Sequence, residues 1–187
     1  NDEIDDIDYA ATNSNLNLVF NLLASQLTDE DYLFIYTIDH GDLDDKLDES
    51  YICMWNNENY YASEFASRVK AINTKATHIV MGQCKSGGFI PYFTDSPNIC
   101  ISTACGKYED SWPIRDTFHP KYGQYDEYVY YWTLSHESLV GDTNNDGHVS
   151  ALESHNYAKN RDTQPETPQH YGAGYLSEKL TLTNILT

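Results

Sequence analysis

The segment THIVMGQCKSGG, residues 77–88, decides the fold that this chain is expected to adopt. Its apolar run at residues 79–81 is short, carries two β-branched side chains and is bounded by Gly82, which is typical of a buried parallel strand. Cys84 follows the end of that strand, and the two glycines soon after it allow the backbone to turn tightly. Ligands of open α/β sheets bind at the carboxyl edge of the strands, so the thiol of Cys84 is placed for chemistry.

A second segment, YLFIYTIDHGD at residues 32–42, has the same character and ends in His40 and Gly41. Two parallel strands joined by a right-handed helical crossover would place His40 and Cys84 side by side at one edge of the sheet. A thiol beside an imidazole is the minimum that an activated cysteine nucleophile needs. Taken alone, Cys84 favours an inert core thiol and His40 a hydrogen-bonded loop histidine. Because each follows a buried strand and each has glycine soon after it, the joint pattern favours catalysis.

Hydrophobic periodicity and turn residues predict the remaining elements. A helix is expected at residues 15–27, with Thr12 or Ser14 as its N-cap, and a crossover helix at 62–72. The five carboxylates of residues 41–49 indicate a solvated loop that attracts cations. The other expected elements are a strand at 50–55, a covering loop or short helix at 89–93, a strand at 98–104, a long functional loop at 106–124, helices at 125–139 and 151–161, and a final strand formed by Leu180, Leu182, Ile185 and Leu186.

The composition limits the classes of function. A chain of 187 residues with 40% hydrophobic residues can form one domain with a sizeable core. A net charge of -18 disfavours nucleic-acid binding, since phosphates would be repelled, and favours basic substrates or divalent cations. No apolar run approaches the roughly 18 residues of a membrane span. The four cysteines are too few for a disulfide scaffold, and their spacing does not match a zinc site. Cys100 and Cys105 are expected as buried thiols, and a disulfide that involves Cys53 is left as an alternative.

Three motifs resemble the caspase, legumain and gingipain group of cysteine peptidases, and most of all its bacterial legumain-like members. They are TIDHGD at residues 37–42, GQCKSGGFI at 82–90 and ISTACGKYEDSW at 101–112. The resemblance implies an α/β fold, a caspase-like three-layer αβα sandwich with a mostly parallel sheet. Residues 1–187 would form a single peptidase domain that lacks the first strands of the family sheet.

The resemblance also implies the activity, that of a cysteine endopeptidase acting through a Cys–His dyad and an acyl-enzyme. Cys84 would be the nucleophile and His40 its acid–base partner, and the N–H groups of Gly41 and Cys84 would form the oxyanion hole. Asp126 and the carboxylates of residues 41–49 favour a basic P1 side chain, with Asn as the alternative, and Gly82 stands where the family carries Glu or Gln. The residues expected to bind substrate are Gln83, Ser102, Thr103 and Asp126.

The partners expected from the same likeness are a peptide or protein substrate and an N-terminal fragment that completes the sheet, because an open sheet edge would be a liability. No nucleic acid and no membrane span are expected, and the bacterial relatives suggest a secreted or cell-surface protein. A different class of function stays open: a calcium-stabilised binding or adhesion module with a vestigial peptidase site.

A twelve-residue segment, DTNNDGHVSALE at residues 142–153, matches an EF-hand calcium loop. Gly147 stands at the position of the sharp turn and Val149 at that of the apolar anchor. The alternative is an acidic loop without metal. If Ca²⁺ binds, we expect a structural role, because the loop is far in sequence from Cys84. The expected ligands are Asp142, Asn144, Asp146, His148 through its carbonyl, Ser150 and Glu153.

Overall fold

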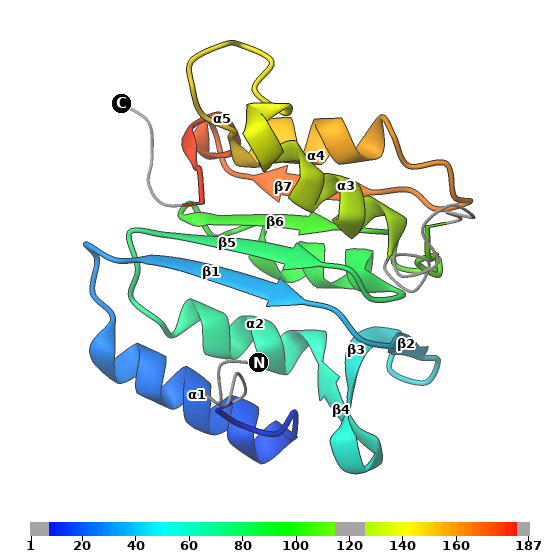
Figure 1. Cartoon of the computed structure of the whole chain (residues 1–187). Coiled ribbons are helices and arrows are strands. Elements are labelled where there is room, and N and C mark those ends of the chain that lie inside the picture. The colour runs from blue at the N-terminus through cyan, green and yellow to red at the C-terminus, as the bar shows by residue number, and fades with distance from the viewer. Residues whose placement is uncertain (1–7, 115–125, 183–187) are drawn as a thin grey trace, which may run out of the picture.

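The structure, a computed structural model, describes residues 8–114 and 126–182. Within them a four-stranded sheet lies at the centre, with β1, β5 and β6 parallel and β7 antiparallel to β6. Figure 1 shows the carboxyl ends of the three parallel strands on the same side of the molecule. The predicted α/β class with a mostly parallel sheet is confirmed. In spatial order the strands are β1 (Tyr32–Thr37), β5 (Ala76–Met81), β6 (Ile99–Thr103) and β7 (Gln169–Gly172).

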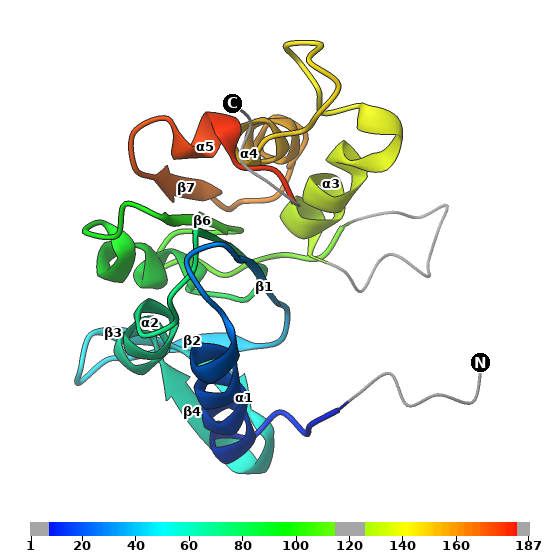
Figure 2. The ribbon, with the colours of Figure 1, turned by 90° about the vertical axis from the view of Figure 1, so that its left-hand side faces the viewer.

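Helices cover both faces of this sheet, as Figures 1 and 2 show. One face carries α1 (Asn13–Gln26), α2 (Ala62–Lys70) and the 3-10 segment η2 (Ser86–Phe93). The other carries α3 (Glu127–Ser135), followed by η3 (Glu137–Leu139), then α4 (Ala151–Lys159) and α5 (Leu176–Lys179). The predicted helices are thus present, and the Thr12 side chain caps α1 by accepting the N–H of Asn15. None of the helices in the described ranges has the length and apolar character that crossing a bilayer requires.

The strand β5 is buried along its whole length. Its side chains alternate between the two faces of the sheet and enter two separate cores. Ile79 and Met81 belong to the cluster that contains Phe65, whereas Val80 belongs to the cluster that contains Tyr128. Because both faces are covered, the strand shows no apolar–polar alternation: its apolar run at residues 79–81 is buried, and so are Thr77 and His78 before it.

The carboxylate-rich segment 41–49, predicted as a loop, is in part a strand. A small antiparallel sheet follows β1 and is formed by β2 (Gly41–Asp44), β3 (Glu49–Met54) and β4 (Glu58–Tyr61). Pairing between Asp42 and Tyr51 satisfies the backbone of β2 while the carboxylates at the hairpin tip stay exposed. Between β3 and β4 the chain turns within η1 (Trp55–Asn57), where both asparagines have positive φ.

The prediction of a final strand in the tail is wrong for its described part. The last strand is β7, which pairs with β6 at an earlier place in the chain. Leu180 instead follows α5 and is buried at 2% exposure against Ala76 and Ala151. The sequence QHYG of β7 has no apolar run, so only its pairing with β6 identifies it as a strand. Ile185 and Leu186, and residues 115–124 of the predicted long loop, lie outside the described residues.

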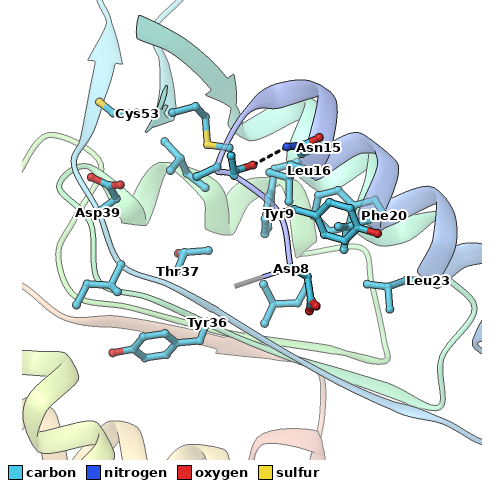
Figure 3. A pocket seen from close by; sticks show the side chains of 18 of the residues that line it. Asp8, Tyr9, Asn15, Leu16, Phe20, Leu23, Tyr36, Thr37, Asp39 and Cys53 are labelled. Carbon is cyan, nitrogen blue, oxygen red and sulfur yellow. Dashed lines mark hydrogen bonds between the residues drawn. The ribbon is translucent and has the colours of Figure 1, made fainter. Parts of the chain in front are cut away.

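The strand β1 forms one edge of the described sheet and borders a groove of about 540 Å³ on the side of α1. Figure 3 shows Leu16, Phe20 and Leu23 of α1 across this groove from Thr37 of β1. On the other face of β1, Phe34 is 39% exposed although it stacks on Trp132. An edge strand with apolar side chains on both faces is typical of a sheet that can accept a further strand.

One buried histidine lies between the sheet and α3. His78 is 3% exposed, its ring contacts the edges of Phe34 and Trp132, and neither ring nitrogen has a hydrogen-bond partner. Burial lowers the pKa of His78 from 6.5 to about 3. The folded protein therefore holds a neutral imidazole here, whereas the unfolded chain binds a proton below pH 6.5.

We expect the substitution His78→Leu to raise stability, and to raise it more in acid. The wild type loses stability as pH falls from 6.5 towards 3, because protonation favours the unfolded chain, and leucine removes this loss. The gain should be about 2 kcal/mol larger at pH 5 than at pH 7.5. Urea unfolding of both proteins at the two pH values measures it. A gain that is the same at both pH values would show that His78 carries no such proton linkage.

Candidate active site

The ends of β1 and β5 are held together just beyond the two strands. The N–H of Gly82 donates to the carbonyl of Thr37 at 2.9 Å. Gly41 lies so close to the next turn that an added Cβ would be 2.4 Å from the carbonyl oxygen of Cys84. Glycine at position 41 is therefore required by this approach. The segments that carry His40 and Cys84 are neighbours at the carboxyl edge of the sheet.

A cavity of about 390 Å³ opens at this edge. It brings together His40, Cys84 and Asp126, which are remote in sequence. His40 and Cys84, which the sequence predicts at one edge of the sheet, thus line the same cavity. The full lining consists of Ile38, Asp39, His40, Gly82, Cys84, Ser111, Trp112, Pro113 and Asp126.

Cys84 is half-buried, and its sulfur faces the backbone of Ser111. The N–H of Ser111 donates to Sγ at 3.3 Å. The thiol in turn donates to the carbonyl of Ser111 at 3.8 Å. The next residue, Lys85, has φ of 61°, so the chain turns sharply after the cysteine, and its ammonium pairs with Asp110 at 2.9 Å.

His40 is exposed, and its backbone is fixed from two sides. Its N–H donates to Oδ1 of Asp39 at 2.6 Å, and its carbonyl accepts the N–H of Cys53 at 2.9 Å. The second bond ties the segment after β1 to β3. The small antiparallel sheet therefore holds the backbone of His40 at the cavity.

Asp126 is the acidic residue of the cavity and the N-cap of α3. Its Oδ1 accepts the N–H of Val129 at 2.7 Å, whereas its Oδ2 has no partner. Ser111 is the nearest hydroxyl of the lining, but its Oγ donates to the carbonyl of Gly82 at 2.7 Å. Burial raises the pKa of Asp126 to about 7, and the Val129 N–H opposes this rise only in part.

The other three predicted substrate-binding residues do not line the cavity. Gln83 is fully buried and accepts the hydroxyl of Thr37 at 2.8 Å. Ser102 lies inside the sheet layer at 2.8 Å from Nδ1 of His170, and Thr103 donates to the carbonyl of Cys105. All three side chains are fully buried and hydrogen-bonded within the protein, so none of them is open to the cavity.

The sequence also left out residues that form the cavity wall. Ser111, Trp112 and Pro113 line it. All three belong to the segment predicted as a functional loop, and Ser111 and Trp112 also end the motif at residues 101–112, but none was named as a site residue. Pro113 forms a bridge with Asp126, and this pairing brings the loop against the start of α3. The N–H of Trp112 donates to Oε2 of Glu166 at 2.8 Å, which attaches a further carboxylate to the wall.

A second cysteine and histidine are close together elsewhere in the fold. Sγ of Cys100 lies 3.7 Å from Nε2 of His170, which is also 2.8 Å from Oγ of Ser177. Cys100 is 0% exposed, and burial raises the pKa of its thiol to about 12. A protonated thiol without access to solvent is a poor nucleophile, so this pair is part of the core. The thiols of Cys100 and Cys105 are buried as predicted, and all four cysteines are free.

The predicted calcium loop turns around its own carboxylates. Asp142 accepts the N–H groups of Asp146 at 3.2 Å and of Gly147 at 2.9 Å, and Gly147 has φ of 85°. Asn144 accepts the same Asp146 N–H at 2.8 Å, and Asp146 accepts that of His148 at 3.0 Å. These bonds close the first half of the loop onto its own side chains.

The end of the loop is closed by Glu153. Ser150 and Glu153 form a capping box at the start of α4, and Oε1 of Glu153 accepts the N–H of Thr143 at 3.0 Å. Burial tends to raise the pKa of Glu153, but the donors on Ser150 and Thr143 outweigh it and leave the pKa lowered. Over the described ranges, no three His, Cys, Asp or Glu side chains gather as a metal site. An EF-hand loop would add amide, hydroxyl and carbonyl ligands to its carboxylates.

Comparisons with known proteins show a similar fold and a matching family. The crystal structure of protein GSU0716 from Geobacter sulfurreducens superposes with a TM-score of 0.61 at 12% identity, over 88% of this chain and 74% of that chain. At this identity the likeness concerns the fold alone. No curated protein sequence matches. The sequence model described as the Peptidase C13 family, the legumain family, matches residues 12–180. This chain therefore belongs to the Peptidase C13 family, as its motifs indicated.

Proposed function

We propose that this protein is a cysteine endopeptidase in which Cys84 is the nucleophile and His40 is the acid–base partner. The family membership supports a cysteine peptidase. The observation that carries the assignment of residues is the cavity that both side chains line at the carboxyl edge of the sheet. Cys84 is also the half-buried thiol with a backbone donor on its sulfur, whereas Cys100 and Cys105 are sealed in the core.

In the proposed reaction, His40 takes the thiol proton and the Cys84 thiolate attacks the scissile carbonyl carbon. A C–S bond forms, and the carbonyl oxygen becomes an oxyanion that faces the N–H groups of Gly41 and Cys84. His40 then gives its proton to the leaving amine as the C–N bond breaks, which leaves an acyl-enzyme. Water, deprotonated by His40, attacks the acyl carbon, and the C–S bond breaks to return the thiolate.

We assign a basic P1 side chain to the substrate, with Asn as the second choice. Asp126 supports this preference because it presents a buried oxygen without a partner to the cavity. The net charge of -18 acts in the same direction by attracting basic peptides. Gly82 leaves no room for the side chain that the family carries there, since an added Cβ would lie 2.7 Å from Val129.

Peptide reporters with Arg, Lys, Asn or Asp at P1 test this proposal. The wild type should release the reporter group fastest after Arg or Lys, and Cys84→Ala and His40→Ala should each lower kcat by at least about 10³-fold, because the nucleophile and its base act as a unit. Rates are measured in separate assays for each reporter. Equal rates for all four reporters would overturn the P1 preference, and activity in Cys84→Ala would overturn the assignment of the nucleophile.

Alkylation by iodoacetamide gives a control that does not need a substrate. Cys84 should react much faster than the other thiols, because burial raises the pKa of Cys53, of Cys105 to about 11 and of Cys100 to about 12. His40→Ala should slow the labelling of Cys84 and leave that of Cys53 unchanged. Slow and uniform labelling, together with inactivity, would favour the binding or adhesion module with a vestigial site.

We further propose that an N-terminal fragment completes the sheet beside β1. The edge position of β1 and the groove next to α1 support it, since a strand added there would cover Leu33 and Ile35. Native mass spectrometry of the protein from its source should show this chain bound to a shorter polypeptide. A fully active species with the mass of this chain alone would contradict it. The same purification shows whether the protein is secreted or on the cell surface, as the bacterial resemblance suggests.

We also propose that the loop at residues 142–153 binds Ca²⁺ and stiffens the connection between α3 and α4. Wild-type protein should melt at a higher temperature with Ca²⁺, by an amount that corresponds to about 2.7 kcal/mol when Ca²⁺ is 100 times its Kd. Asp142→Ala and Glu153→Ala should abolish this rise, whereas the exposed Glu137→Gln should keep it. Calorimetric melting with Ca²⁺ and with EDTA makes the measurement. A wild-type melting temperature that is the same in both would show that the loop holds no calcium.

A further inference from the structure

Three buried carboxyl oxygens beside the cavity have no hydrogen-bond partner: Oδ2 of Asp126, Oδ2 of Asp162 and Oε1 of Glu166. They come from the N-cap of α3 and from the segment between α4 and β7. The other oxygen of each carboxyl group accepts a backbone hydrogen bond of 2.7–2.9 Å. Val129 donates to Asp126, Gln164 to Asp162 and Trp112 to Glu166. The side chains are therefore held in place while one oxygen of each is left over.

These carboxyl groups form one cluster with the cavity wall. Asp126 lines the cavity at 7% exposure, and Glu166 is bonded to Trp112, which also lines it. Burial, and after it the charges of Asp126 and Asp162, raise the pKa of Glu166 to about 10. Burial also raises the pKa of Asp162. A shared proton turns the contact between Asp162 and Glu166 into a hydrogen bond, which two carboxylates could not form.

The surroundings of the cluster supply negative charge and no cation in the described part of the chain. Glu127 adds a carboxylate from α3, held by the hydroxyl of Thr163 at 3.1 Å. Burial raises the pKa of the Cys105 thiol to about 11, and the charge of Glu166 adds to this rise. The ion pairs among the described residues lie elsewhere and join Lys70 to Asp95, Lys85 to Asp110 and Lys107 to Asp48. Unpaired buried carboxylates are costly, so either protons or a bound cation must compensate them.

We infer that Asp162 and Glu166, together with Asp126, form a cation site at the end of the cavity. The site takes the guanidinium or ammonium group of a basic P1 side chain. This cation replaces the proton shared by Asp162 and Glu166. The inference rests on the proposed function and names specificity-determining residues for it. On binding, the shared carboxyl proton leaves to solvent and the two carboxylates face the cation. Binding of a basic side chain is then coupled to proton release.

Calorimetry with benzamidine, a cation of suitable shape, tests the site without any catalysis. Titrations at pH 7 in two buffers with different ionisation enthalpies should show release of about one proton for each benzamidine bound. Benzamide, its neutral isostere, should bind at least about tenfold more weakly. Glu166→Gln and Asp162→Asn should each weaken benzamidine binding at least about tenfold and reduce the proton release, whereas the exposed Glu137→Gln should change neither. The amide introduced by Glu166→Gln keeps an acceptor for the N–H of Trp112, and melting temperatures verify that each variant is folded.

Two results would overturn the cation site: benzamide binding as tightly as benzamidine, or folded Glu166→Gln and Asp162→Asn proteins binding benzamidine like Glu137→Gln. Reporters with Arg or the neutral citrulline at P1 separate this inference from the proposed function. Proton-coupled benzamidine binding without cleavage of any reporter would retain the site and reject the peptidase. Cleavage that depends on Cys84 but does not distinguish Arg from citrulline in wild type or in Glu166→Gln would reject the site and retain the peptidase.

Discussion

The close approach of two backbone segments at the carboxyl edge of the sheet is the constraint on which this molecule depends. The parallel pairing of β1 with β5 continues past both strands through the bond from Gly82 to Thr37. It brings Gly41 against the carbonyl of Cys84 with no room for a side chain. The placement of His40 and Cys84 at one edge is therefore a consequence of sheet register, and the loop at residues 111–113 closes the cavity beside them.

The parts of the fold that could be predicted from sequence are those encoded locally. Both β1 and β5 can be recognised as buried strands followed by glycine. Because parallel strands end at one edge of the sheet, these two local patterns together predict that His40 and Cys84 lie at the same edge. The helices α1 and α2 could also be predicted, since their apolar residues recur at helical spacing. In these segments the local sequence and the global fold favour the same structure.

The parts that could not be predicted depend on pairing between distant segments. Nothing in the sequence QHYG marks β7, and nothing near Trp112 indicates that its N–H meets Glu166. For Ser102 the sequence predicted a substrate contact that the structure does not show. A motif placed this residue near the substrate, but strand alternation turns its side chain to the interior, where it contacts His170. Distance along the chain to a motif does not determine the direction of a side chain, whereas the register of the sheet does.

The carboxyl groups of Asp126, Asp162 and Glu166 lie beside the cavity of the proposed nucleophile, and their protonation limits the negative charge there. The proposed reaction needs an anionic sulfur, and a carboxylate near it has an electrostatic cost. Cys84 and Asp126 line the same cavity. Burial keeps this cost small, because it raises the pKa of Asp126 to about 7 and that of Glu166 to about 10, so the cluster carries less charge than its composition suggests. In the proposed enzyme full charge would develop only when a substrate cation is present to balance it. Nucleophile and acidic pocket can then share one cavity, because the same burial that removes water from the carboxyl groups also holds their protons in place.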